Sequence, residues 1–186
     1  MVHQGVLPLR QDRPDDGKLY SNVPMTQVEW LVHYIAKAFA DVSLDGGIDI
    51  HAAQSMDDYG NPEEDRLSRT AERKDWRRVP IAILQPRFWA ITFLDAKGFR
   101  FYAPAIMTEL LKHGDATNNL SAWFLHGLEV TPSGIMKDAP FDELFNSAQR
   151  AAIIRYLKHV VHNVPSLDNG DAEKRLRDIQ TCTGTG

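Results

Sequence analysis

The stretch that most constrains the fold runs from Phe88 to His113 and is the most apolar and most aromatic part of the chain. Large rings are interleaved there with a glycine, a proline and a few charged side chains, among them Asp95 and Arg100. Large apolar residues are usually buried, and charged groups carried among them need partners. We therefore expect this stretch to form the centre of the core.

The composition is that of a soluble globular protein with one domain. The chain has 186 residues, of which 43% are hydrophobic and 25% charged, and a chain of this length buries about two thirds of its unfolded surface. The net charge of −4 provides no broad basic field, so neither nucleic acid nor a membrane surface is an expected partner. The single Cys182 cannot form an internal disulfide, and no secretory signal or membrane-spanning run is visible, so we expect a cytoplasmic location.

Most of the chain has the periodicity of α-helices. Thr26 and Glu29 have the form of a capping box, and apolar residues follow at spacings of three and four. Similar signals predict helices over 104–113 and 148–162, and a very polar helix over 62–78 that begins with a proline. The predicted fold class is therefore mainly α, as a single compact helical domain.

A short strand pair is the alternative for part of the core. Residues 89–94 and 99–103, or residues 122–126, combine aromatic and β-branched side chains that suit strands. Over so short a window a buried helix has the same pattern. An α+β fold therefore stays open as the second fold class.

The prolines and turn residues divide the chain into three parts. An extended N-terminal arm is expected over 1–24, where prolines alternate with polar residues. The globular domain is expected over 25–163, and a C-terminal tail over 164–186. Within this tail we expect only one or two helical turns, around Ala172 to Ile179.

An ordered series of residues runs through the globular part. It comprises a tryptophan, a Val-Pro pair, a central FLDAKGFRFYAPA block and a later Gln-Arg-Ala helix, namely Trp76, Val79-Pro80, 93–105 and 149–151. This series resembles a family of small bacterial proteins known only as a domain of unknown function, with an FLD-x-x-G-x-RFY-x-PA block. The resemblance covers roughly residues 27 to 162. It implies a shared fold and a bacterial origin, and no activity, because the family has none to carry over.

The central block also contains the candidate catalytic residues. Asp95, Arg100 and Tyr102 lie close in sequence and could supply a carboxylate base, a guanidinium clamp for an anion and a phenol donor, with Arg150 opposite them. In the structural interpretation, Asp95 caps the following turn and Arg100 makes one buried ion pair. We favour the structural interpretation, because no nucleophile–base pair is evident.

Two further groups of residues could bind ligands. His159 and His162 are three residues apart on a helix and could share a metal ion if a third ligand came from elsewhere. No complete metal or cofactor motif supports this, so we predict no metal and no cofactor and assign the histidines to a helix end. Basic residues are dense over 66–78, but acidic residues are interleaved with them, which is typical of a solvated helical face.

The predicted function is a protein-interaction accessory, and its narrower form is an immunity protein that neutralises a toxin. Acidic loops, including Asp57 and Asp58, suit a basic partner, and Trp76 at the edge of the polar helix could anchor it. The alternative is an enzyme with a polar site around Asp95, Arg100 and Tyr102.

Overall fold

The computed structural model describes residues 24–114, 119–129, 139–164 and 169–183. Within these ranges the chain forms helices joined by turns and contains no strand, so the mainly-α prediction is confirmed and the alternative strand pair is wrong. The arm predicted over 1–24 lies outside the described residues except for Pro24.

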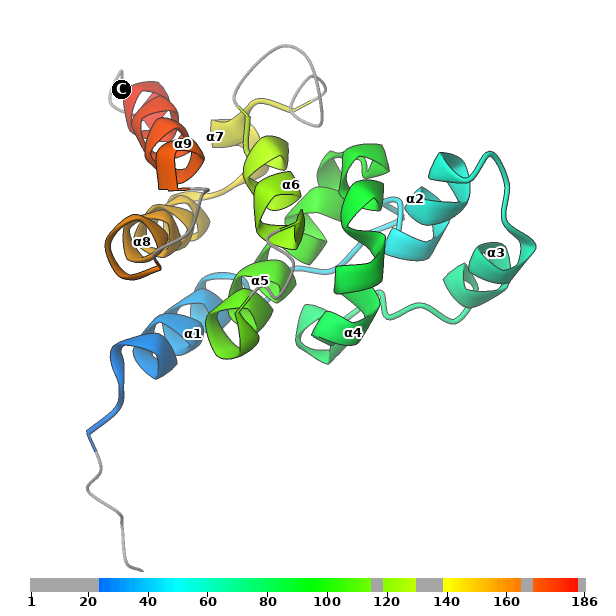
Figure 1. Cartoon of the computed structure of the whole chain (residues 1–186), viewed down its shortest axis with the longest axis horizontal. Helices are drawn as coiled ribbons and strands as arrows, with labels where there is room; N and C mark the ends of the chain where they lie inside the picture. Colours follow the sequence, from blue (N-terminus) through cyan, green and yellow to red (C-terminus); the bar gives the residue numbers. More distant parts are fainter. Residues whose placement is uncertain (1–23, 115–118, 130–138, 165–168, 184–186) are drawn as a thin grey trace, which may run out of the picture.

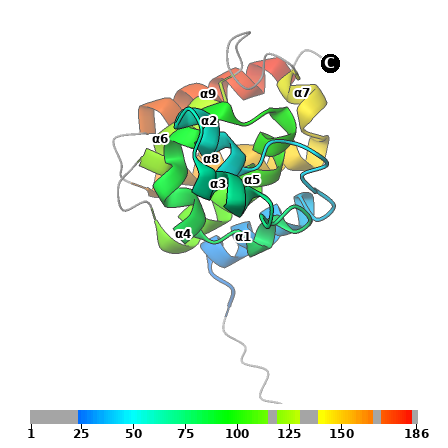
Figure 2. The same cartoon turned by 90° about the vertical axis from the view of Figure 1, so that its right-hand side faces the viewer.

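Helix α5 crosses the centre of the molecule and contacts α1, α4, α6, α7 and η1 (Figure 1). Helices α1, α8 and α9 lie at one end, and α2 and α3 lie at the other. Viewed from the second end, α2 and α3 stand in front of α5, and the remaining helices surround it (Figure 2). The elements are α1 (Gln27–Ala38), α2 (Ile50–Asp57), α3 (Pro62–Ser68), η1 (Trp76–Arg78), α4 (Ile81–Leu84), η2 (Gln85–Phe93), α5 (Ala96–His113), α6 (Asn119–Gly127), α7 (Phe141–Leu144), α8 (Ser147–Asn163) and α9 (Asn169–Thr183).

The central helix begins earlier than its sequence suggested. Asp95 is the N-cap of α5, and its Oδ1 accepts the N–H of Gly98 at 2.7 Å and that of Ile48 at 3.0 Å. Pro104, expected in the first turn, lies inside the helix. The cap at Asp95 therefore sets the helix start, and the strand-like residues 99–103 are helical.

The polar helix expected over 62–78 is shorter in the structure. Helix α3 ends at Ser68, and the backbone then turns so that the carbonyl of Arg73 accepts the N–H of Leu44 at 2.9 Å. The Glu72 carboxylate accepts the N–H groups of the two residues after Arg73, at 2.9 and 3.1 Å. These contacts satisfy backbone groups that a continuous helix would have bonded internally, so only the short η1 follows.

The C-terminal segment contains a long helix, α9, where one or two turns were expected. It packs against α8, and its Ala172 and Ile179 are fully buried. Arg175, also buried, donates from Nε to the carbonyl of Leu125 in α6 at 3.0 Å. The packed part of the chain thus continues beyond residue 163.

Candidate ligand-binding groove

The predicted catalytic block does not form one site. Asp95 is used as a helix cap, and the buried Tyr102 hydroxyl accepts the N–H of Ile50 at 3.1 Å. Arg100 lies on another side of α5, because two residues of α-helix turn through about 200°, and it lines a separate cleft of about 440 Å³. The three groups therefore cannot act on one substrate.

The two arginines of the prediction also have separate roles. Arg150 Nη1 donates to the carbonyls of Asp142 and Phe145, both at 2.8 Å, and so ties α8 to the α7 turn. Arg100 is half-buried beside the acidic residues Asp142 and Glu143, but it forms no hydrogen bond or ion pair with the described residues. The buried ion pair expected for Arg100 is therefore absent from the described part of the chain.

The predicted partner-binding residues divide between core and surface. Trp76 is only 2% exposed, and its Nε1 donates to the carbonyl of Phe39 at 2.9 Å, so it packs inside the domain and cannot anchor a partner. Asp57 and Asp58 lie at the end of α2 on the surface. Beside them, Tyr59 is 100% exposed and has a left-handed φ of 56°.

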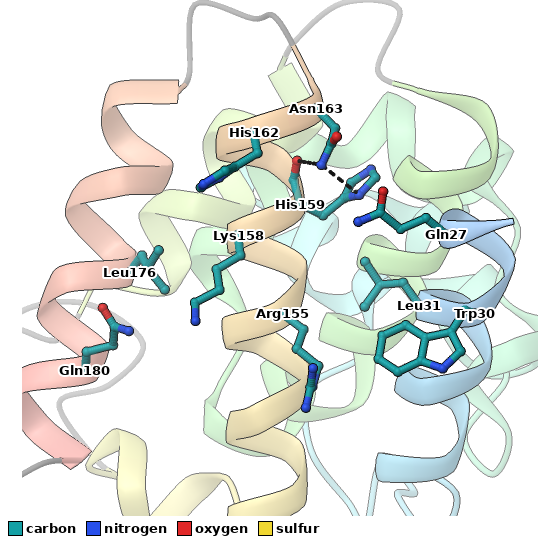
Figure 3. A pocket seen from close by; sticks show the side chains of 10 residues that line it. All are labelled: Gln27, Trp30, Leu31, Arg155, Lys158, His159, His162, Asn163, Leu176 and Gln180. Atoms are coloured by element: carbon teal, nitrogen blue, oxygen red, sulfur yellow. Dashed lines mark hydrogen bonds between the residues drawn. The ribbon is translucent and has the colours of Figure 1, made fainter.

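An open cleft with a volume of about 670 Å³ lies between α1, α8 and α9. Figure 3 shows α8 between the other two helices, with Leu176 and Gln180 on one side and Gln27, Trp30 and Leu31 on the other. We call this cleft the α8 groove. Its lining residues are Gln27, Trp30, Leu31, Arg155, Lys158, His159, His162, Asn163, Leu176 and Gln180.

Helix α8 supplies the polar residues of the α8 groove from a single face. Arg155, Lys158, His159 and His162 recur at spacings of three, four and seven, which places them in one row on a helix. The residues between them include those that α8 buries in the core. The helix is therefore amphipathic in the usual way, but its outer face is basic.

Aromatic rings hold Arg155 at the edge of the α8 groove. Its guanidinium carbon lies 4.8 Å from the ring centroid of Tyr34 and 5.5 Å from that of Trp30. The two rings are themselves stacked, with centroids 5.2 Å apart. Stacking of this kind stabilises the cation by about 0.5–1 kcal/mol at exposed sites, and it leaves the N–H groups of Arg155 without a carboxylate partner among the described residues.

The uncharged form of His159 is favoured by its surroundings. Burial lowers its pKa, which favours the uncharged imidazole at neutral pH. The Asn163 side-chain amide lies 3.4 Å from Nδ1 and donates to the backbone carbonyl of His159 at 3.2 Å. If Nδ1 accepts from this amide, Nε2 carries the proton and is a further donor.

The α8 groove is suited to binding an anion. None of its ten lining residues carries a carboxylate, whereas Arg155 and Lys158 are cationic and Gln27, His159 and His162 can each donate an N–H. Of these residues, only His159 and His162 were expected from the sequence as possible ligands. The helical spacing of all four α8 residues was the signal that would have identified the site.

A metal centre is not formed by these histidines in the described residues. No three His, Cys, Asp or Glu side chains gather closely enough there to hold an ion.

Among the described helices, none is both long and apolar enough to cross a lipid bilayer.

Comparison with known proteins gives a family but no activity. No curated protein and no solved structure matches the chain. The family described as "Family of unknown function (DUF6714)" matches residues 27–179, which extends the resemblance predicted for 27 to 162 through most of α9. Because this match covers most of the residues, the chain belongs to that family of unknown function.

Proposed function

We propose that the protein is an interaction accessory that binds an acidic segment of a partner protein in the α8 groove. The observation that carries the proposal is the row of basic and N–H-donating residues on α8, with no carboxylate in the lining. A carboxylate in this position would accept charge-assisted hydrogen bonds, which are roughly twice as strong as neutral ones. The cleft volume of about 670 Å³ is also within the usual range for ligand sites.

Apolar walls favour a peptide over a simple inorganic anion. Trp30 is 44% exposed, and Leu31 and Leu176 line the same cleft. Exposed tryptophans often contribute strongly to protein–protein contacts. The chain's net charge of −4 disfavours a long polyanion such as nucleic acid, which would be repelled outside the groove. An acidic segment with one or two apolar side chains fits both features.

Selection from a library of short random peptides tests this proposal. The wild-type protein is expected to enrich peptides that combine Asp or Glu with Leu or an aromatic residue. Lys158→Glu introduces a carboxylate into the α8 groove and is expected to lower the affinity for the selected peptides by tenfold or more, as measured by calorimetry. The affinity of the wild-type protein should also fall as the salt concentration rises.

The matched control is Lys174→Glu, on the exposed surface of α9 and outside the groove lining. It changes the net charge by the same amount as Lys158→Glu. A loss of affinity in Lys158→Glu alone would therefore come from a contact in the groove, whereas equal losses would come from the charge of the whole protein. Peptides with no acidic enrichment, or equal losses of affinity in the two variants, would contradict the proposal.

The narrower form of the proposal is an immunity protein that neutralises a toxin in the bacterial cytoplasm. Its support is the small acidic chain together with the α2–α3 turn, where Asp57 and Asp58 directly precede the fully exposed Tyr59. Tyrosine is frequent at binding hot spots, and the carboxylates would complement a basic surface. Co-expression with toxic gene products from the native host tests this form, and rescue should be lost in a Tyr59→Ala, Asp57→Lys variant. Failure to rescue growth from any neighbouring gene product would refute it, while the peptide binding of the α8 groove would stand.

A further inference from the structure

A second cavity, of about 280 Å³, lies at the other end of the molecule from the α8 groove. Helices α2, α3, α4 and α5 and the segment around η1 line it, and none of them lines the α8 groove, so the cavity is independent of the proposed peptide site. Most of the surface that lines it is apolar, and His51 and Tyr102 are among the residues that contribute polar atoms. The lining residues are Ile50, His51, Leu67, Thr70, Ala71, Glu72, Arg78, Val79, Ile83 and Tyr102.

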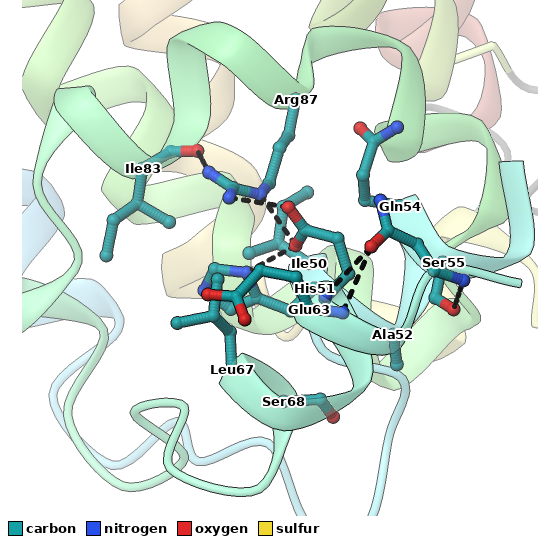
Figure 4. A network of polar contacts seen from close by, with 12 residues as sticks. Ile50, His51, Ala52, Gln54, Ser55, Glu63, Leu67, Ser68, Ile83 and Arg87 are labelled. Carbon is teal, nitrogen blue, oxygen red and sulfur yellow. Dashed lines mark hydrogen bonds and ion pairs between the residues drawn. The ribbon is translucent and has the colours of Figure 1, made fainter. Parts of the chain in front are cut away.

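A buried network fixes the ring of His51 at this cavity. Its Nδ1 lies 2.7 Å from Oε2 of Glu64, and Arg87 donates to both oxygens of Glu64, from Nε at 3.0 Å and Nη2 at 2.7 Å (Figure 4). Arg87 Nη1 also donates to the carbonyl of Ile83 at 3.1 Å. The same figure shows the side chains of Ile83 and Leu67, both cavity residues, beside the network.

This network leaves one nitrogen of His51 available. The hydrogen bonds from Arg87 lower the pKa of Glu64, so its carboxylate is ionised and accepts the proton on Nδ1 of His51. In the neutral imidazole Nε2 is then an acceptor. His51 is only 7% exposed, and Nε2 has no partner among the described residues.

Tyr102 offers the complementary group. Its oxygen accepts the N–H of Ile50, but its own O–H has no acceptor within the described ranges, although the residue is 1% exposed. Burial raises the pKa of Tyr102, so the hydroxyl stays protonated and remains a donor. A buried donor left without a partner is unfavourable, so a ligand that accepts from it is stabilised. His51 and Tyr102, which both line the cavity, therefore have one unused acceptor and one unused donor.

The charged residues of the cavity do not select a charged ligand. Arg78 Nη1 lies 3.5 Å from Oε2 of Glu72, and the Arg78 side chain is 74% exposed, so the pair is close to neutral and open to water. The volume of the cavity is near the lower limit of the ligand sites found in proteins, about 300 Å³.

We propose that this cavity binds a small, uncharged, mostly apolar molecule that carries one hydroxyl group. The hydroxyl donates to Nε2 of His51 and accepts from the O–H of Tyr102, and the apolar part of the molecule packs against Leu67, Val79 and Ile83. Glu64 and Arg87 are positioning residues, because they hold the tautomer and orientation of the imidazole without touching the ligand.

Phenol is the probe that tests the proposal, and toluene is its matched control without a hydroxyl. Titration of ¹⁵N-labelled protein with phenol is expected to give a saturable shift of the His51 ring nitrogens, and toluene a weaker effect. Tyr102→Phe removes only the hydroxyl and should weaken phenol binding about tenfold while toluene binding is unchanged.

A second variant keeps the test decisive if Tyr102→Phe disturbs the fold. Ala71→Leu enlarges a wall residue without touching the network and is expected to reduce the binding of both molecules. The unfolding temperature of each variant reports whether the fold is intact. The proposal is overturned if phenol causes no saturable shift at His51, if phenol and toluene bind equally, or if Ala71→Leu binds phenol as the wild type does.

Discussion

Replacement of Glu64 by glutamine removes a buried charge with little change in side-chain shape. Its carboxylate is the shared partner of Arg87 and His51, both largely buried. Glu64→Gln leaves Arg87 as a poorly compensated charge, so we expect the free energy of unfolding to fall by about 3 kcal/mol. Chemical denaturation measures this loss.

The neighbouring Glu63 is the control for that substitution. It pairs with Arg66 at the surface, where both side chains are more than half exposed. Glu63→Gln is expected to change the free energy of unfolding much less than Glu64→Gln does, because exposed ion pairs contribute little to stability. Equal losses in the two variants would mean that the buried network does not stabilise the fold.

The same carboxylate predicts a dependence on pH. Hydrogen bonding by Arg87 lowers the pKa of Glu64 below its ordinary value of 4.5. A lowered folded-state pKa gives stability that is complete above the unfolded value and is lost as the pH falls through the folded value. The stability difference between wild type and Glu64→Gln should therefore be constant near neutral pH and shrink below about pH 4.5. A difference that stays constant into acid would contradict this assignment.

Tyr59 has an unfavourable backbone conformation, and its side chain makes no packing contact that would offset the cost. Its φ of 56° is left-handed, a region that costs most L-residues about 1–2 kcal/mol and that asparagine tolerates better. Because Tyr59 is 100% exposed, its ring adds no packing. Tyr59→Asn is thus expected to raise the free energy of unfolding by about 1 kcal/mol, whereas Tyr59→Phe keeps the strain and should leave it unchanged. A destabilised asparagine variant would show that the ring contributes to the folded chain.

For single residues, contacts between neighbours in the sequence were predictable, and contacts between residues far apart in the sequence were not. The capping of Gly98 by Asp95 spans three residues, so the pattern of residue types revealed it. The contact between His51 and Glu64 spans 13 residues, and that between Glu64 and Arg87 spans 23, with no spacing rule that connects them. Closeness in sequence was also misleading, because Arg100 and Tyr102 lie on different sides of their helix.

The start of α5 depends on a close contact between two backbones. A Cβ on Gly98 would lie 2.4 Å from the carbonyl oxygen of Ile48, which is backbone and cannot move aside easily. Gly98→Ala is therefore expected to lower the free energy of unfolding by about 1–3 kcal/mol or more. Gly170, in the first turn of α9, has open space around its Cα, so Gly170→Ala should instead stabilise the protein by up to about 1 kcal/mol. Similar changes in both variants, seen in thermal unfolding, would refute the close contact.

The elements that were predicted well have strong end signals. Thr26 and Glu29 form the capping box that their spacing suggested, and α1 begins directly after Thr26. Residues 88–94 have no such signals. Residues 88–93 form 3₁₀ turns and Leu94 is extended, an outcome that alternation or helical period over so short a window could not indicate. Pro104 was misleading because a proline is most easily accommodated in the first turn of a helix, whereas this one lies inside a helix that begins at Ala96.

The whole molecule has its two candidate sites at opposite ends, joined through the buried α5. The α8 groove depends on α1, α8 and α9, and the smaller cavity depends on α2, α3, α4 and α5. This separation explains why the aromatic centre of the sequence contains neither site in full: Tyr102 alone reaches the cavity, and the rest of α5 supports the helices around it.

The α8 groove is part of the folded domain only if the C-terminal helix α9 is packed stably against it. Ile179 is fully buried where α9 packs on its neighbours, so Ile179→Ala should lower the free energy of unfolding by about 2–4 kcal/mol. The exposed Lys174→Ala on the same helix is the control and should change it by less than about 0.5 kcal/mol. If the segment after residue 163 were only a tail, Ile179→Ala would have no more effect than the control. Because Leu176 and Gln180 supply one wall of the groove, a destabilised Ile179→Ala variant should also bind the selected acidic peptides more weakly, in proportion to the fraction of molecules in which α9 is detached.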